Sequence, residues 1–256
     1  MVDTIVMIHG MWGGSWYWER YKNFFESKGY TCVTPILRFH DINPKAVPPA
    51  ELGTTSLLDY TDDLEKEIKK LPSKPILMGH SMGGLLSQML AERGLAKAIV
   101  LLTPASPAGI LALRMSVIKS FWSGMTKWGF WKKPMRQTFE EAVYSMMHLL
   151  PVEEQKSSYE KFVYESGRAA FEIGLWFFDS KKASKVDDSK ITCPVLVIAG
   201  KEDRITPASV VKNIARKYKT VSTYKEFEHH AHWVVAEPGW EDVASYVEEW
   251  LKTHVQ

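Results

Sequence analysis

The sequence of 256 residues lacks several features that would point to other classes of protein. No apolar run approaches the roughly 20 residues that a membrane-spanning helix needs. The N-terminus has no charged segment followed by an apolar core of the kind that directs secretion. No long basic run is present, and 32 Lys and Arg nearly balance 30 Asp and Glu, so nothing indicates nucleic-acid binding. These absences predict a cytoplasmic protein without a membrane span.

Cysteine is also scarce, with only Cys32 and Cys193 in the chain. Both lie beside apolar, strand-like runs. We interpret them as free, buried thiols of a reducing compartment, with a disulfide between them as the alternative.

What the sequence does contain is an alternation of short apolar runs and helical patterns. Nearly continuous apolar runs are typical of strands covered on both faces. Alternation with helices predicts a doubly wound, mostly parallel α/β sheet with right-handed crossovers. The predicted strands are Thr4–Ile8, Thr31–Ile36, Pro75–Met78, Ala98–Leu102, Pro194–Ala199 and Val221–Phe227. The predicted helices between them are Leu57–Leu71, one from Met82, one from Pro207 with Thr206 as N-cap, and Trp240–Thr253.

The alternation stops between the fourth and fifth strands. The segment there is rich in aromatic residues and methionine, and it contains no convincing strand. We predict a helical cap at residues 106–188, inserted into a core made of residues 1–105 and 189–256. The expected cap helices are Leu111–Trp122, Phe139–Leu150 and Val152–Phe178, the last broken near Gly167.

The strongest chemical signal is Gly79-His80-Ser81-Met82-Gly83, between a predicted strand and a predicted helix. This G-x-S-x-G pattern is typical of a nucleophile elbow, a strained turn that exposes the serine hydroxyl. Ser81 is therefore the candidate nucleophile. A serine nucleophile needs a histidine base, itself oriented by a carboxylate.

The candidate acid follows the strand at residues 194–199, in Lys201-Glu202-Asp203-Arg204. We favour Asp203, with Glu202 in the same turn as the alternative. The base is expected after the last strand, where His229, His230 and His232 occur. We favour His232 because it directly precedes the next element, and His230 is the alternative. A metal site at these histidines is disfavoured, because no neighbouring residues match a ligand spacing.

The oxyanion formed during acyl transfer needs two backbone N–H donors. Met82, the residue after the nucleophile, supplies one at the N-terminus of its helix. The second is expected from the glycine-rich loop after the first strand, His9-Gly10-Met11-Trp12-Gly13-Gly14, with the Met11 amide as donor. Ligands of open α/β sheets bind at the carboxyl ends of the strands, where this loop and the elbow both lie.

Taken together, these segments resemble the α/β-hydrolase superfamily. The resemblance rests on H-G-M-W-G-G at residues 9–14, G-H-S-M-G-G at 79–84, G-x-x-D-x-x-x-P at 200–207 and H-W-x-x-x-E-P at 232–238. The opening segment is also similar to the plant methylesterase and hydroxynitrile-lyase branch. The resemblance implies a triad of Ser81, Asp203 and His232, an oxyanion hole of the Met11 and Met82 amides, and a sheet of about six strands. It implies no metal and no organic cofactor.

The predicted function is hydrolysis of carboxylic esters of small to medium apolar substrates through an acyl-enzyme. The same triad also serves C–C bond hydrolysis, lactone opening, perhydrolysis and cyanohydrin cleavage, so these stay open. A ligand receptor on a hydrolase scaffold is the rival from another class. The expected partner is a small-molecule ester. Aromatic side chains that could line its pocket, or else pack in the core, are Trp12, Trp122, Trp128 and Trp176.

Overall fold

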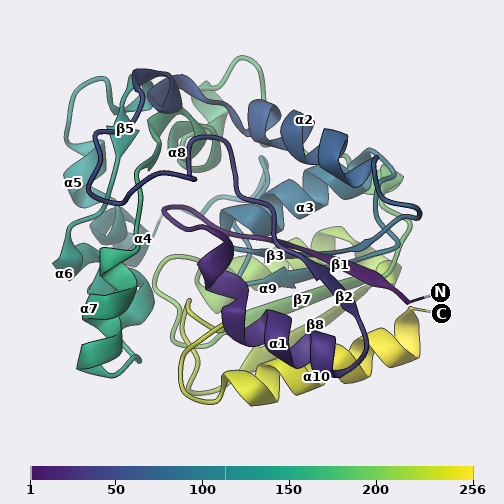
Figure 1. The fold of residues 1–256 in the computed structure, drawn as a ribbon. Coiled ribbons are helices and arrows are strands. Elements are labelled where there is room, and N and C mark those ends of the chain that lie inside the picture. The colour runs from purple at the N-terminus through teal and green to yellow at the C-terminus, as the bar shows by residue number, and fades with distance from the viewer. Residues whose placement is uncertain (1, 113, 256) are drawn as a thin grey trace.

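Six strands form one parallel sheet in the order β2-β1-β3-β4-β7-β8 (Figure 1). The structure, a computed structural model, describes residues 2–112 and 114–255. Every neighbouring pair of strands in this sheet is parallel, which confirms the predicted α/β class and strand number. The strands are β1 (Thr4–Ile8), β2 (Thr31–Val33), β3 (Ile76–His80), β4 (Ala98–Leu102), β7 (Val195–Gly200) and β8 (Ser222–Phe227).

The pattern of burial follows the strand order. Strands β3, β4 and β7 are buried throughout, and β1 is buried except at its first residue, as their continuous apolar sequences require. The edge strands β2 and β8 are partly exposed. Strand β2 ends at Val33, three residues earlier than predicted. Pro35, which has no amide hydrogen to donate to a ladder, follows closely.

Helices cover both faces of the sheet. On one face α1 (Glu19–Ser27) packs beside α10 (Trp240–His254), with the rings of Tyr21 and Trp240 5.9 Å apart. The other face carries α2 (Leu57–Ile68), α3 (Met82–Glu92) and α9 (Ala208–Lys217). The Tyr218 hydroxyl, just after α9, donates to Gln88 of α3 at 2.5 Å. Helix α9 begins one residue later than predicted, with Pro207 rather than Thr206 at its N-cap.

Between β4 and β7 the chain forms a separate set of short elements, seen at the left of Figure 1. Its helices are α4 (Met115–Ser120), α5 (Trp122–Met125), α6 (Phe139–Ala142), α7 (Val152–Glu160) and α8 (Gly167–Gly174), with a π-helical turn at Val143–Met147. The predicted helices Phe139–Leu150 and Val152–Phe178 are thus present but divided. In the predicted helix Leu111–Trp122, residue 113 lies outside the described residues, and the observed helix begins at Met115. The expectation of no strand is wrong, because β5 (Pro134–Met135) and β6 (Glu165–Ser166) pair antiparallel. Strands of two residues are too short to produce an alternating pattern.

A buried polar cluster links this segment to the core. His40 Nε2 lies 3.1 Å from a Glu165 carboxylate oxygen, and both side chains are fully buried. The Tyr60 hydroxyl of α2 donates to the other Glu165 oxygen at 2.7 Å. The second His40 nitrogen faces the Arg38 carbonyl at 2.9 Å. Because both neighbours of the imidazole are acceptors, both ring nitrogens must carry protons, and His40 is an imidazolium.

The pKa of His40 agrees with this geometry. Burial alone would lower that pKa, but the Glu165 carboxylate and hydrogen bonds outweigh it, and the pKa is raised above its ordinary value. Glu165 and His40 therefore form a buried ion pair between the segment and the core. Such pairs tolerate the loss of one partner poorly, since the other charge stays buried without compensation.

We expect the His40–Glu165 pair to make the free energy of unfolding depend on pH. Because the pKa is raised in the folded protein, the contribution is complete below about pH 6.5 and is lost as the pH rises through the folded-state value. Urea unfolding should show that His40→Gln costs about 3 kcal/mol near pH 6 and clearly less at alkaline pH. An equal cost at acid and alkaline pH would contradict a charged His40.

Cys32 and Cys193 are both free, as expected, but only Cys32 is buried, and Cys193 is half-buried. Burial, together with nearby Glu26, raises the pKa of Cys32 to about 12. Over residues 2–112 and 114–255, no helix has the length and apolar character needed to cross a membrane.

Candidate active site

Ser81 lies in a strained turn between β3 and α3. Its φ of 55° and ψ of −119° belong to a region that residues other than glycine rarely adopt. The turn is held by its own backbone: the Ser81 amide donates to the Leu102 carbonyl at 3.0 Å, and the Ser81 carbonyl accepts from the Ala105 amide at 2.9 Å. Strain of this kind costs about 1–3 kcal/mol and is concentrated at functional sites.

The glycines around Ser81 are required by close backbone packing. A Cβ atom at Gly83 would overlap the Ile8 carbonyl oxygen, and one at Gly79 would overlap the Gly83 carbonyl oxygen. Helix α3 therefore approaches β3 at Gly79 and the end of β1 at Gly83 more closely than any side chain at these positions allows. This close approach explains the glycines two positions before and two after the serine.

Asp203 and His232 come together at the carboxyl end of the sheet. His232 Nδ1 lies 2.8 Å from Asp203 Oδ2, and both side chains are fully buried. The other Asp203 oxygen accepts from the backbone amides of Ile205 and Thr206, each at 2.8 Å. With a carboxylate on Nδ1, the neutral ring carries its proton there and leaves Nε2 free to accept one. His232 Nε2 is buried and has no hydrogen-bond partner among the described residues.

The alternative acid and bases lie elsewhere. The Glu202 side chain is 44% exposed, and one of its carboxylate oxygens lies 3.9 Å from Nδ1 of the exposed His229 ring. His230 pairs instead with Glu237 at 2.9 Å. The three histidines thus face three different carboxylates. The described part of the chain holds no group of three or more His, Cys, Asp or Glu placed to bind one metal ion.

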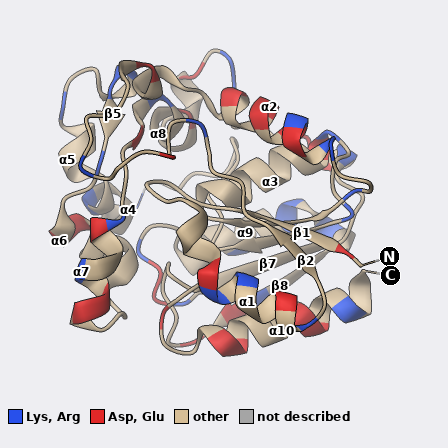
Figure 2. Cartoon of the chain, in the orientation of Figure 1, with Lys and Arg blue, Asp and Glu red and all other residues tan. Residues whose placement is uncertain are grey.

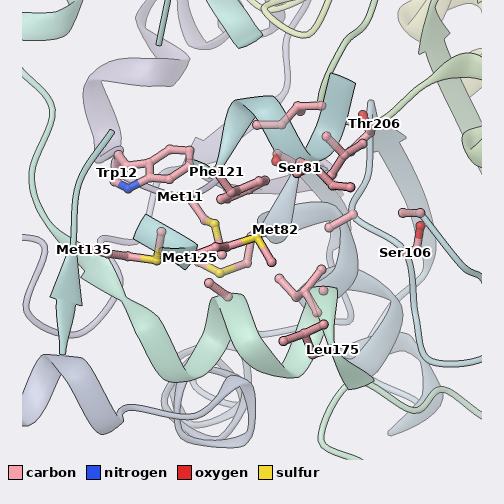
Figure 3. Close-up of a pocket in the computed structure, with 18 of the residues that line it drawn as sticks. Met11, Trp12, Ser81, Met82, Ser106, Phe121, Met125, Met135, Leu175 and Thr206 are labelled. Carbon is pink, nitrogen blue, oxygen red and sulfur yellow. The ribbon is translucent and has the colours of Figure 1, made fainter. Parts of the chain in front are cut away.

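The loop after β1 is anchored on both sides of Met11. His9 Nε2 accepts from the Leu37 amide at 3.1 Å, so His9 Nδ1 carries the proton and donates to the Gly10 carbonyl at 2.8 Å. Burial, with charged His40 nearby, lowers the pKa of His9 to about 3, and the ring is neutral. The Tyr17 hydroxyl donates to the Met11 carbonyl at 2.9 Å. Met11 and Met82 line the same pocket as Ser81 (Figure 3).

Three polar residues support the site in roles that the sequence analysis did not predict. The Thr206 hydroxyl lies 2.7 Å from Asp203 Oδ2 and 3.2 Å from His232 Nδ1. His80 Nε2 donates to the His232 carbonyl at 2.8 Å, and the Thr103 hydroxyl donates to the same carbonyl at 3.2 Å. Burial, with His232 next to it, lowers the pKa of His80 to about 3, so its ring is neutral. These contacts hold the backbone of His232 and the carboxylate of Asp203 in place.

A pocket with a volume of about 90 Å³ opens beside Ser81 (Figure 3). Among the described residues, no charged side chain lines it, and the only side-chain hydroxyls in the lining are those of Ser81, Ser106 and Thr206. The thioethers of four methionines from the core and the inserted segment surround it: Met11, Met82, Met125 and Met135. Methionine side chains are flexible and polarisable, so a pocket lined by them adapts to apolar groups of different shape.

The tryptophans expected in the pocket are only partly there. Trp12 is buried and lines it. Trp122 and Trp128 are 61% and 87% exposed, and neither lines the pocket. Helix α4 ends at Ser120, so that Phe121 rather than Trp122 is directed into the pocket. Trp176 is half-buried and also outside the lining, which Leu175 supplies instead.

Comparison with known proteins identifies the family of the chain. The family model described as alpha/beta hydrolase fold matches residues 3–238. The chain belongs to this α/β-hydrolase family. Polyneuridine aldehyde esterase of Rauvolfia serpentina is 33% identical over 82 residues, which are 31% of this chain and 30% of that protein. Alpha-hydroxynitrile lyase of Arabidopsis thaliana is 30% identical over 98 residues, or 38% of this chain and 36% of that one.

The chain aligns with about a third of the length of these curated relatives. Solved structures match over far more of it. A methylesterase from Arabidopsis has a TM-score of 0.74 at 15% identity and covers 98% of this α/β-hydrolase, with all of that chain matched. A pyrethroid hydrolase from Sphingobium faniae gives 0.74 at 16% identity, with 98% of each chain covered. At such identities the likeness shows the fold.

Proposed function

We propose that this α/β-hydrolase is a serine esterase that cleaves carboxylic esters through an acyl-enzyme. The observation that carries the proposal is the fully buried Asp203–His232 pair, whose free Nε2 is a base without a partner, next to a pocket lined by Ser81. Esterases among the relatives and among the similar folds support the same reaction.

In this mechanism His232 Nε2 takes the proton of the Ser81 hydroxyl as the oxygen attacks the ester carbonyl. Asp203 holds the ring by Nδ1 and stabilises the imidazolium that forms. His232 then gives the proton to the departing alkoxide, which leaves as the alcohol. Water then enters, loses a proton to the same nitrogen and attacks the acyl carbonyl. As this second tetrahedral intermediate collapses, the bond to Ser81 Oγ breaks, His232 returns the proton to that oxygen, and the carboxylic acid leaves.

The Met11 and Met82 amides are the proposed oxyanion donors. Met82 is the first residue of α3, where the backbone amide has no partner within the helix and the helix dipole favours negative charge. The anchored carbonyls of Gly10 and Met11 fix the orientation of the loop that carries the other amide. Two such donors stabilise the tetrahedral intermediate more than the ground-state carbonyl.

Residues 106–188 are the proposed cap. They supply about two thirds of the pocket lining, including Phe121, Met125 and Leu175, while the core supplies Ser81. An apolar acyl or alcohol group fits such a lining. A carboxylate buried there would lack a partner, which costs several kcal/mol unless the group is neutralised.

We therefore expect a strong preference for neutral acyl groups. The p-nitrophenyl ester of hexanoic acid and the mono-p-nitrophenyl ester of adipic acid have chains of equal length, but the second ends in a carboxylate. The kcat/KM for the neutral ester should be higher by about 100-fold or more. Their rates of alkaline hydrolysis without enzyme serve as the control for intrinsic reactivity. Similar kcat/KM values would contradict an apolar acyl site.

A fluorophosphonate probe and a panel of esters with varied acyl and alcohol length test the function itself. An esterase is labelled at Ser81 and turns over simple esters many times. A receptor on the same scaffold binds a ligand tightly with negligible turnover. Because one relative is a hydroxynitrile lyase, the panel should include a cyanohydrin, with release of cyanide as the readout.

A further inference from the structure

The exposed Trp and Phe side chains are confined to one region of the molecule. Among the described residues, all of them lie within residues 106–188. They are Trp122, Trp128, Phe177 and Phe178, with exposed fractions of 61%, 87%, 46% and 71%. Leu111 and Met115 of the same region are 59% and 80% exposed. Single exposed apolar residues are ordinary, but a concentration of large ones indicates an interaction surface.

Most of these side chains flank the pocket beside Ser81. Leu111 and Trp122 are each next in sequence to a pocket-lining residue, Ala112 and Phe121. Met115 is two positions from Val117, and Phe177 and Phe178 follow Leu175 by two and three positions. The exposed apolar groups therefore belong to the same two stretches of chain that line the cavity. We call these six residues, with the cations described next, the cap surface.

The first part of this region carries charge of one sign. Residues 106–139 contain six Lys and Arg and no Asp or Glu. Five of these cations are exposed: Arg114, Lys119, Lys127, Lys132 and Lys133. None of the five lies within ion-pair distance of a carboxylate in the part of the chain that the structure describes. Figure 2 shows blue segments around α4, α5 and β5, with red on the neighbouring α6 and α7.

We propose that the cap surface docks onto an anionic lipid surface. Tryptophan prefers the boundary between water and hydrocarbon, because its ring is apolar and its N–H is polar. Lysine and arginine beside it lay their apolar stems along the boundary and reach the anionic headgroups with their charges. Unpaired cations interspersed with exposed aromatics match a lipid headgroup layer in both charge and polarity. Docking in this way places the uncharged pocket next to a phase in which apolar esters dissolve.

This proposal goes beyond ester hydrolysis and does not depend on Ser81. The full chain is mixed with vesicles of phosphatidylcholine, alone or with about a third phosphatidylglycerol, and bound protein is measured by sedimentation. We expect binding to the anionic vesicles that weakens with salt, together with a blue shift of tryptophan fluorescence. The Ser81→Ala variant should bind as the wild type does, which separates docking from catalysis.

Paired variants test the two kinds of contact. Lys127→Ser with Lys132→Ser should weaken partition into anionic vesicles about 30-fold, since each near-surface cation contributes about 1 kcal/mol. Lys66→Ser with Lys70→Ser, in the last turn of α2 and just after it, removes the same charge from another part of the surface and should have little effect. Trp122→Ala with Trp128→Ala should weaken partition about tenfold and abolish most of the fluorescence shift. Hydrolysis of a water-soluble ester should be unchanged in both lysine pairs.

Several results would overturn lipid docking. Absence of wild-type binding to anionic vesicles is one. An equal loss of vesicle binding in the two lysine pairs would mean that binding depends on the net charge of the protein and not on the cap surface. Binding that persists without the tryptophans, and that heparin competes for as well as lipid does, would indicate a polyanion or a protein partner. If the tryptophan pair fails to fold, Trp122→Gln alone, a neutral change at a side chain already 61% exposed, tests the apolar contact.

Discussion

We expect Ser81→Ala to lose nearly all hydrolysis of a soluble ester such as p-nitrophenyl butyrate. Removing one member of a triad that acts as a unit lowers kcat by about 10⁴- to 10⁶-fold. The decrease should fall on kcat rather than on KM, because the pocket around residue 81 stays intact and the apolar lining is unchanged. Fluorophosphonate labelling should disappear with it, because no nucleophilic oxygen remains at the elbow.

Ser106→Ala is the matched control for this variant. Ser106 is buried and lines the same pocket, so its removal tests whether any hydroxyl there is sufficient. We expect near-wild-type kcat for Ser106→Ala and an unchanged melting temperature for both variants. Substantial turnover by Ser81→Ala in a preparation free of other esterases would refute the acyl-enzyme mechanism.

The parts of the fold that sequence analysis predicted are those with strong local patterns. The strands β1, β3, β4 and β7 are nearly continuous apolar runs in the sequence. Such runs are typical of strands covered on both faces, and these strands are buried in the structure. The strand pair β5–β6 was not predicted, because a strand of two residues has no periodicity and the two strands are about thirty positions apart in the sequence. Helix ends in the inserted segment also shifted, since short helices there follow tertiary packing more than local preference.

The same distinction applies to the site. Ser81, Asp203 and His232 stand in short patterns at the ends of predicted strands, and the last two are 2.8 Å apart in the structure. Thr206 and the His40–Glu165 pair have no such pattern. His40 and Glu165 are 125 positions apart in the sequence. A charged residue whose partner is so distant in sequence cannot be distinguished there from an ordinary surface residue. The prediction that Trp122, Trp128 and Trp176 line the pocket was wrong for a related reason. Composition does not tell which face of a short helix is buried.

The other large effect is expected for Asp203→Asn. The asparagine side chain has nearly the same shape, and its amide oxygen can still accept from the Ile205 and Thr206 amides that now bind Asp203 Oδ1. What changes is the group facing His232 Nδ1: an amide NH₂ there donates, so the ring must carry its proton on Nε2 and cannot accept one from Ser81. A loss of about 10⁴-fold in kcat is typical of this tautomer error.

Glu202→Gln provides the control one position away in the same turn. Its side chain is 44% exposed and touches neither His232 nor the pocket, so kcat should stay within about twofold of the wild type. Because the asparagine amide no longer stabilises a positive imidazolium, the residual activity of Asp203→Asn should rise with hydroxide concentration at alkaline pH rather than level off. The reverse ranking, with Glu202→Gln inactive and Asp203→Asn active, would reassign the acid. Equal and modest losses in both would mean that the buried Asp203–His232 pair supports the fold and not the reaction.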